Sequence, residues 1–326
     1  IEPNVGRIEV PDSRLRQLAK IASSKKIIAT QLEIVDIAGL VKGASKGEGL
    51  GNQFLGHIRT TDAILHLVRC FENGDVTHVN GNIDPIRDIE IVETELMLAD
   101  LESLKKREAS ICKKNNADLA AEKAFLERSI DWLEDGKMLN LLTLNAQEKD
   151  FADSLHLITK KPVLYVCNVS ENEIISGNIF TKEVENLSRD RNSATVVTSA
   201  AIEAEIALLR DETERELYLQ SLGLSESGLA RVIRGGYGLL DLITFFTVGP
   251  PEARAWTTKK NSKAPTAAGV IHTDFEHGFI CAETISYDDY VAHNGESGAK
   301  AAGKLRLEGK EYAIKDGDVL HFRFNV

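Results

Sequence analysis

Two strand-like runs that each end in a polar motif constrain the fold of this chain most strongly. The run 31–35 is followed by Asp36-Ile37-Ala38-Gly39, and the apolar run 162–167 is followed by Asn168-Val169-Ser170-Glu171. A third run, 63–70, is apolar enough for a strand that is buried on both faces, which is typical of parallel sheets. The sequence therefore predicts an α/β fold with a doubly wound, mostly parallel sheet.

The segment Asp36–Gly39 has the order of a Walker B/switch motif, an apolar strand followed by Asp-x-x-Gly. Such a strand end projects its Asp toward Mg²⁺, usually through a water, and its Gly lets a backbone N–H approach a γ-phosphate. An isolated Asp-x-x-Gly is more often a turn, but this one follows a strand and precedes a second motif on a later strand. We therefore expect Asp36 to hold Mg²⁺ through water and Gly39 to contact the γ-phosphate.

The residue after this motif is Leu40, where Ras-like enzymes carry a Gln that orients the attacking water. Leucine cannot hydrogen-bond water, so we expect hydrolysis to be slow or to recruit another group. Residues 41–52 contain glycines at close intervals, which favours a mobile switch loop; a flexible connector is the alternative.

The segment Asn168–Glu171 resembles the Asn-Lys-x-Asp motif with which P-loop GTPases recognise their base, with two positions changed. In that motif the Asp accepts hydrogen bonds from N1–H and the exocyclic amine of guanine, whereas adenine has no N1–H. The longer Glu171 and Val169 in the Lys position disfavour guanine, while Asn168 can still bond the purine N7. We expect Asn168, the Val169 backbone and Glu171 to read adenine; a surface Asn-x-x-Glu at a strand end is the alternative.

A further strand, 194–198, ends in the small residues Ser199-Ala200-Ala201. This turn resembles the Ser-Ala-x loop that closes over the purine in GTPases, where small side chains let backbone amides reach the base. We expect Ser199 and Ala200 to cap the base.

Composition excludes several classes of protein. A length of 326 residues suggests about two or three domains, and the net charge of −11 argues against nucleic-acid binding over the whole surface, although a local basic patch could bind RNA. The four cysteines lie far apart, without the paired spacing of a zinc or redox site. No stretch of these residues approaches the length of a membrane span, and we expect no secretory signal before the fold. We expect a cytoplasmic protein without a membrane partner.

The interval between Asp36 and Asn168 is much longer than one βαβ unit, and much of it is helical. Apolar residues recur at three- and four-residue spacing over 89–106 and 117–133, which predicts two antiparallel helices. The basic residues near their tip, which could bind RNA or a partner or form a solvated helix end, are Lys105, Lys106, Lys113 and Lys114.

The last part of the chain changes character. Residues 245–256 alternate like an edge hairpin, and an Asp-Gly turn precedes an alternating strand at the end. We therefore predict a nucleotide domain over 1–88 and 161–241, an inserted helical arm over 89–160, and a small mixed α/β module over 242–326.

Together these features resemble the YchF/Obg-like ATPase family of translation-factor-related P-loop NTPases, across essentially the whole chain. The resemblance implies a Ras-like G domain interrupted by a helical coiled-coil arm and followed by a C-terminal TGS domain of β-grasp form. It also implies ATP hydrolysis in preference to GTP, dependence on Mg²⁺ and association with the ribosome. The segments that carry it are Ile1–Gly6, Asp36–Asn52, Arg69–Asn73, Asn168–Glu171, His272–Glu276 and Asp316–Val326.

The resemblance further implies that a histidine in a mobile loop replaces the missing Gln, and the matching position is His78. A neutral imidazole can orient or deprotonate water near pH 7, although an ordinary surface histidine fits the sequence equally well. The family's phosphate loop and its Mg²⁺-binding Thr would precede Ile1, so we expect the natural chain to extend upstream. Because that loop supplies most phosphate affinity, these 326 residues alone should bind ATP poorly.

The sequence therefore favours a monomeric, ribosome-associated ATPase that uses ATP and Mg²⁺, with nucleotide state controlling its switch loop and partner contacts. Two alternatives remain open: a non-catalytic ATP-sensing adaptor in translation, and an Obg-type GTPase.

Overall fold

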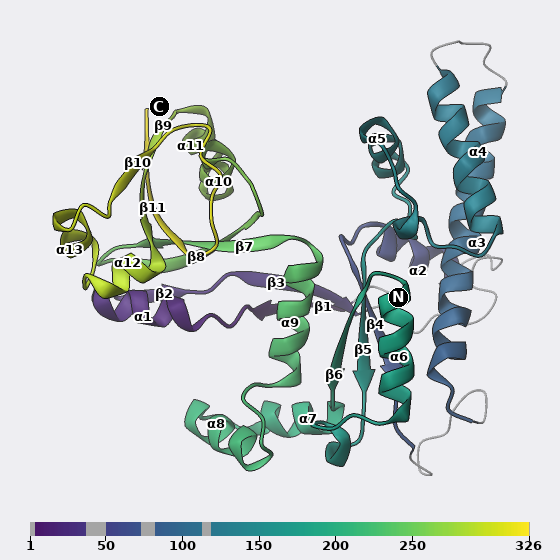
Figure 1. Ribbon diagram of the computed structural model, residues 1–326, viewed down its shortest axis with the longest axis horizontal. Helices are drawn as coiled ribbons and strands as arrows, with labels where there is room; N and C mark the ends of the chain where they lie inside the picture. Colours follow the sequence, from purple (N-terminus) through teal and green to yellow (C-terminus); the bar gives the residue numbers. More distant parts are fainter. Residues whose placement is uncertain (1–3, 37–49, 73–81, 113–118, 326) are drawn as a thin grey trace. The chain divides into compact units, whose positions relative to one another are not determined.

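The computed structural model describes residues 4–36, 50–72, 82–112 and 119–325 (Figure 1). Two compact units make up the chain: Ile1–Gly6 with Val35–Leu239, and Arg7–Ile34 with Leu240–Val326. The strands β1 (Asn4–Glu9) and β3 (Gln31–Asp36) pair with each other in a two-stranded sheet. None of the described helices is long and apolar enough to cross a bilayer.

The first unit is built on a parallel sheet of β4 (Ile64–Arg69), β5 (Val163–Asn168) and β6 (Ala194–Thr198), in the order β4-β5-β6. The central strand β5 is buried on both faces: Tyr165 and Cys167 belong to one apolar core, Leu164 and Val166 to another. This confirms the predicted parallel strands and explains why their sequences are nearly continuous apolar runs.

Helices cover both faces of this sheet. On one face pack α6 (Ile179–Asp190) and the first part of α3 (Pro85–Cys112), and on the other packs α9 (Gly228–Leu239). The remaining elements of the unit are α2 (Leu50–Arg59), α4 (Ala120–Glu134), η3 (Leu139–Leu141), α5 (Ala146–Ser154), η4 (Glu171–Glu173), α7 (Ala200–Leu208) and α8 (Glu212–Ser221).

The two helices predicted between the strands are present as α3 and α4, which lie side by side (Figure 1). Their shared core contains Leu104 and Ile111 of α3 and Phe125, Leu126 and Ile130 of α4. The predicted tip residues Lys113 and Lys114 lie outside the described residues.

The second unit contains a six-stranded mixed sheet in the order β10-β9-β11-β7-β8-β2. Its strands are β2 (Lys26–Ile28), β7 (Leu242–Val248), β8 (Glu252–Lys259), β9 (Phe279–Ser286), β10 (Arg306–Glu308) and β11 (Asp318–Phe324). Its helices are α1 (Ser13–Ile21), α10 (Ala264–Ile271), α11 (Thr273–His277), α12 (Tyr287–Ala292) and α13 (Glu296–Ala301).

The hairpin predicted over 245–256 exists as β7 and β8, but it is not at an edge. β7 pairs with β11 on its other side, and β8 pairs in parallel with β2, a strand from near the start of the chain. The edge prediction was wrong because the sequence of the hairpin cannot show that a segment more than 200 residues away supplies the next strand.

The segment Arg7–Ile34 belongs by its contacts to the second unit, whereas the sequence placed it in the nucleotide domain. Helix α1 buries Leu15, Leu18 and Ala19 against Phe246 of β7 and neighbouring residues on one face of the sheet, while α10 covers the other face. The amphipathic helix therefore completes the second face of a sheet that residues 242–326 cover only in part.

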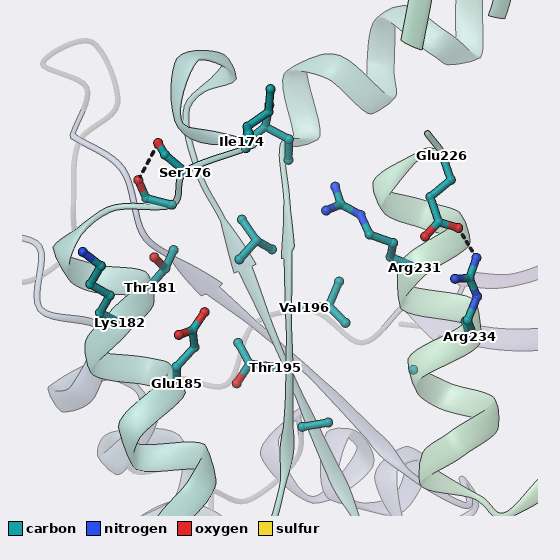
Figure 2. Close-up of a pocket in the computed structure, with 15 residues that line it drawn as sticks. Ile174, Ser176, Thr181, Lys182, Glu185, Thr195, Val196, Glu226, Arg231 and Arg234 are labelled. Atoms are coloured by element: carbon teal, nitrogen blue, oxygen red, sulfur yellow. Dashed lines mark hydrogen bonds and ion pairs between the residues drawn. The ribbon is translucent and has the colours of Figure 1, made fainter. Parts of the chain in front are cut away.

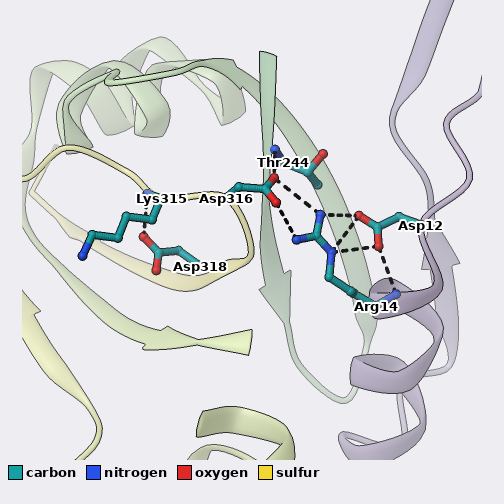
Figure 3. Close-up of polar contacts among 6 residues, drawn as sticks. All are labelled: Asp12, Arg14, Thr244, Lys315, Asp316 and Asp318. Carbon is teal, nitrogen blue, oxygen red and sulfur yellow. Dashed lines mark hydrogen bonds and ion pairs between the residues drawn. The ribbon is translucent and has the colours of Figure 1, made fainter. Parts of the chain in front are cut away.

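Polar contacts hold the same segment in place. The Arg14 guanidinium donates to Asp12 at 2.8 Å, and its Nη1 donates to Asp316 Oδ2 at 2.6 Å (Figure 3). Asp316 also accepts from the backbone N–H of Thr244 at 2.9 Å, so one carboxylate joins α1, β7 and the turn before β11. The two carboxylates raise the pKa of Arg14, with the hydrogen bond to Asp12 as the largest cause.

We predict that Leu18→Ala destabilises the second unit by about 3 kcal/mol, because it empties a fully buried site between α1 and the sheet. The chain has two tryptophans, Trp132 in α4 and Trp256 in β8, so each unit has its own fluorescent probe. Denaturant unfolding should show the loss through Trp256 in a Trp132→Phe background.

The control is Leu126→Ala, which empties an equally buried site in α4 and should lower the stability reported by Trp132 in a Trp256→Phe background. If Leu18→Ala left the Trp256 transition unchanged, α1 would not be part of the second unit's core.

Candidate functional site

The carboxyl ends of β5 and β6 bring four of the predicted residues together. In the parallel register Asn168 lies opposite Thr198, so the loops that follow the two strands leave the sheet at the same edge. The side-chain Oδ1 of Asn168 accepts a hydrogen bond from the backbone N–H of Ala200 at 2.9 Å. The backbone N–H of Val169 donates to the Thr198 carbonyl at 2.9 Å. Asn168, Val169, Ser199 and Ala200 therefore form one cluster.

These two hydrogen bonds determine which polar groups of Asn168 and Val169 remain to bind a ligand. Because Oδ1 of Asn168 is already engaged, the side-chain amide has a defined orientation and its Nδ2 group remains as a donor. Val169 is 3% exposed and packs into the core, and its N–H is used by Thr198. What Val169 can still offer is its carbonyl oxygen, an acceptor.

Glu171 and Ser199 differ in accessibility. Glu171 opens the short helix η4 with an exposed carboxylate that makes no hydrogen bond to the described residues. Ser199 is 1% exposed, and its hydroxyl has no hydrogen-bond partner among the described residues. The next two residues, Ala200 and Ala201, are exposed.

The other predicted site residues are not joined to this cluster in what the structure describes. Asp36 is exposed at the end of β3, and neither a hydrogen bond nor an ion pair engages its carboxylate in the described ranges. Gly39 and His78 lie outside the described residues. Among the described residues, no three His, Cys, Asp or Glu side chains are grouped to hold a metal ion.

Two residues that support the cluster were missed from the sequence. Nδ2 of Asn178 donates to the Cys70 carbonyl at 2.6 Å and joins the loop after β4 to the start of α6. Glu203 of α7 accepts from the backbone N–H of Gly228 at 2.7 Å and ties the helix after Ser199 to the start of α9. The capping box of Asn178 with Thr181 is a local signal that could have identified Asn178.

Helix α2, which follows the predicted switch loop, is fastened to α3 by one arginine. Arg59 donates to Asp100 at 3.3 Å, to Ser103 at 3.0 Å and to the His156 carbonyl at 3.0 Å. Asp100 is fully buried and also accepts from the backbone N–H groups of Ile158 and Thr159. Burial raises the pKa of Asp100, while the hydrogen bonds from Thr159 and Ile158 oppose the rise.

The described basic residues of the helix pair are balanced by carboxylates. Lys105 pairs with Glu134 at 2.5 Å, Lys106 pairs with Glu102 at 2.5 Å, and Arg107 pairs with a largely buried Glu122. These pairs favour the solvated-face interpretation for Lys105 and Lys106 over a free basic patch.

Comparison with known proteins identifies the class. A family model described as "50S ribosome-binding GTPase" matches residues 9–101, and the model of the YchF-GTPase C-terminal family, described as "Protein of unknown function (DUF933)", matches residues 242–325. The solved "Structure of the Schizosaccharomyces pombe YchF GTPase" is 36% identical, with a TM-score of 0.87 over 99% of this chain and 88% of that one. The fold is therefore that of a P-loop GTPase-like nucleotide hydrolase.

Two curated relatives carry the name "Ribosome-binding ATPase YchF". The protein of Bacillus subtilis is 49% identical and that of Escherichia coli O157:H7 is 51% identical, each over 100% of this chain and 90% of the relative. The chain belongs to the YchF family. The names of its relatives disagree on the nucleotide, since the bacterial proteins are called ATPases and the fission-yeast structure a GTPase.

We predict that Asp100→Ala destabilises the first unit by about 2–4 kcal/mol, because the buried N–H groups of Ile158 and Thr159 lose their acceptor. The measurement is denaturant unfolding followed through Trp132 in a Trp256→Phe background. Asp153→Ala, which removes an exposed carboxylate paired with Lys160, is the control and should cost less than about 1 kcal/mol. Equal losses in the two variants would contradict this role of Asp100.

Proposed function

We propose that this protein is a Mg²⁺-dependent ATPase that acts at the ribosome in the cytoplasm, with an adenine-selective base site at the ends of β5 and β6. The observation that carries the choice of ATP is the pattern of groups left free there. Asn168 retains a donor and Val169 retains only an acceptor, because Ala200 and Thr198 occupy their other groups.

This pattern suits adenine better than guanine. The Nδ2 group of Asn168 can donate to N7, which both purines carry. The Val169 carbonyl can accept from the 6-amino group of adenine, whereas guanine presents a carbonyl oxygen at that position and would be repelled. A site whose buried polar groups match one partner rejects the other strongly, because the mismatch leaves those groups unpaired.

Glu171 is the second position that differs from the guanine motif. It is one methylene longer than the Asp of the guanine motif, and it begins the short helix η4. In our proposal Glu171 borders the base, and Ser199 and Ala200 close the site over it.

Asp36 fits a role at a metal-bound phosphate. It ends a strand, it is exposed, and its lone pairs are not used by the described residues. When Mg²⁺ is bound, it neutralises charge on the phosphates. In our proposal Asp36 positions a water on this ion and Gly39 contacts the γ-phosphate.

The contacts of Arg59 suggest how a change in the bound nucleotide moves α3 and α4. α2 begins directly after residues 37–49, and its last residue is held by α3 through Asp100 and Ser103. A shift of α2 on hydrolysis therefore moves a residue that α3 holds through two side chains. In our proposal α3 and α4 form the arm that carries this change to the ribosome, and residues 242–326 form the TGS module.

We predict that Glu171→Asp shifts the preference of the full-length protein toward GTP by about tenfold, since it restores the carboxylate of the guanine motif without placing a lysine in the core, where Val169 is 3% exposed. Competition of ATP and GTP for one fluorescent nucleotide measures the ratio. Glu173→Asp, which shortens a neighbouring carboxylate in η4, is the control and should leave the ratio unchanged. A Glu171→Asp variant with the wild-type ratio would remove Glu171 from the choice of purine.

We propose His78 as the group that orients the attacking water in place of a Gln, because Leu40 cannot. We predict that His78→Ala lowers the turnover of ATP by about 100-fold or more, while ATP binding and co-sedimentation with ribosomes are retained. His277→Ala, an exposed histidine of α11, is the control. An unchanged rate would remove His78 from the mechanism, and undetectable turnover in the wild type would favour the adaptor alternative.

A further inference from the structure

A groove runs along the outer edge of β6 and is distinct from the base site. Its floor is four of the five residues of β6, and its walls are α6 on one side and α9 on the other (Figure 2). The cavity has a volume of about 620 Å³. At its mouth, next to the loop after η4, lies the 69% exposed side chain of Ile175.

The edge of β6 offers backbone groups that the sheet does not use. β6 is terminal in the sheet that the described residues form. In a parallel strand, alternate residues direct their N–H and C=O groups to the same side. Because the Thr198 carbonyl accepts from the Val169 N–H, the residues that bond to β5 are Ala194, Val196 and Thr198. Thr195 and Val197 therefore direct theirs into the groove, where the described chain supplies them with no backbone partner.

The walls carry positive charge that is not compensated. Glu226 pairs with Arg234, and Glu185 pairs with Arg189 at 3.8 Å. Lys182 of α6 and Arg231 of α9 have no ion-pair partner within the described ranges. Nε and Nη2 of Arg231 are buried without any hydrogen-bond partner there, and the side chain extends from α9 toward β6 (Figure 2).

We propose that this groove binds an extended, acidic segment of a partner protein, which adds a strand to β6 and places carboxylates against Arg231 and Lys182. A strand supplies the backbone donors and acceptors that Thr195 and Val197 lack, which is the basis of strand addition at open sheet edges. Successive side chains of such a strand point alternately to α6 and α9, so adjacent acidic residues reach one cation on each wall. A carboxylate is the planar acceptor that a guanidinium binds best.

The test uses a blocked nine-residue peptide of valine and threonine with a central Asp-Glu pair, added to the full-length protein. Amide hydrogen exchange read by NMR should slow at Thr195 and Val197 and stay unchanged at Ala194, Val196 and Thr198, which are already bonded to β5. The same peptide with Asn-Gln at its centre should bind about tenfold more weakly, because it loses the charge.

Two variants test the named residues. Arg231→Gln should weaken the acidic peptide about tenfold and bring it level with the Asn-Gln peptide, without lowering the melting temperature, since Nε and Nη2 make no hydrogen bond in the free protein. Arg234→Gln removes the same charge from the same helix, but from a guanidinium paired with Glu226, and should change binding less than about twofold.

Four results would overturn the proposal: no slowing at Thr195 and Val197, equal binding of the two peptides, protection of these amides by an oligouridine in place of the peptide, or a concentration-dependent dimer that buries β6.

Val197→Pro separates backbone pairing from charge, because it removes one N–H that the sheet does not use. It should abolish peptide binding while ATP binding is retained.

Discussion

The hydrogen bond from the Ala200 N–H to Asn168 Oδ1 is the interaction on which the account of the base site depends. It links the ends of two parallel strands and fixes the orientation of an amide that could otherwise present either its oxygen or its nitrogen. A second bond, from the Val169 N–H to the Thr198 carbonyl, engages the other donor of this loop. The groups that remain are one donor, Asn168 Nδ2, and one acceptor, the Val169 carbonyl. The proposed discrimination between purines rests on which of these groups are already hydrogen-bonded.

Hydrogen bonds to buried polar groups also fix the geometry elsewhere in the first unit. The Arg59–Asp100 contact joins α2 to α3, and buried Asp100 in turn accepts hydrogen bonds from the backbone before β5. At the edge of the sheet, the outward-facing backbone groups of β6 and the Nε and Nη2 groups of Arg231 have no hydrogen-bond partner among the described residues, and both line a groove. Groups that are paired inside the chain fix its geometry, and the unpaired groups are those on which both of our binding proposals rest.

Much of the fold could be predicted from the sequence because parallel strands and packed helices leave periodic apolar patterns. The strands at 63–70 and 194–198, the helices at 89–106 and 117–133, and the hairpin at 245–256 all correspond to observed elements. The placement of Arg7–Ile34 in the second unit could not be predicted, because it depends on the fit between α1 and a sheet more than 200 residues away.

For the site, the motif spacing predicted that Asn168, Val169, Ser199 and Ala200 lie together. It could not show that the Val169 N–H is used by Thr198 or that the Ser199 hydroxyl is buried, since both follow from the register between β5 and β6. Arg59 and Asp100 were missed for a similar reason: neither lies in a motif, and their contact spans 41 residues. The predicted roles of all these residues, and those of Asp36, Gly39, Glu171 and His78, stay predictions.

The most direct test of the central claim is a calorimetric titration of the full-length wild-type protein with non-hydrolysable analogues of ATP and of GTP in the presence of Mg²⁺. The account predicts that the adenine nucleotide binds more tightly, because Val169 offers only an acceptor to the purine 6-position. Tighter binding of the guanine nucleotide by more than about tenfold, which corresponds to roughly 1.4 kcal/mol, would contradict it.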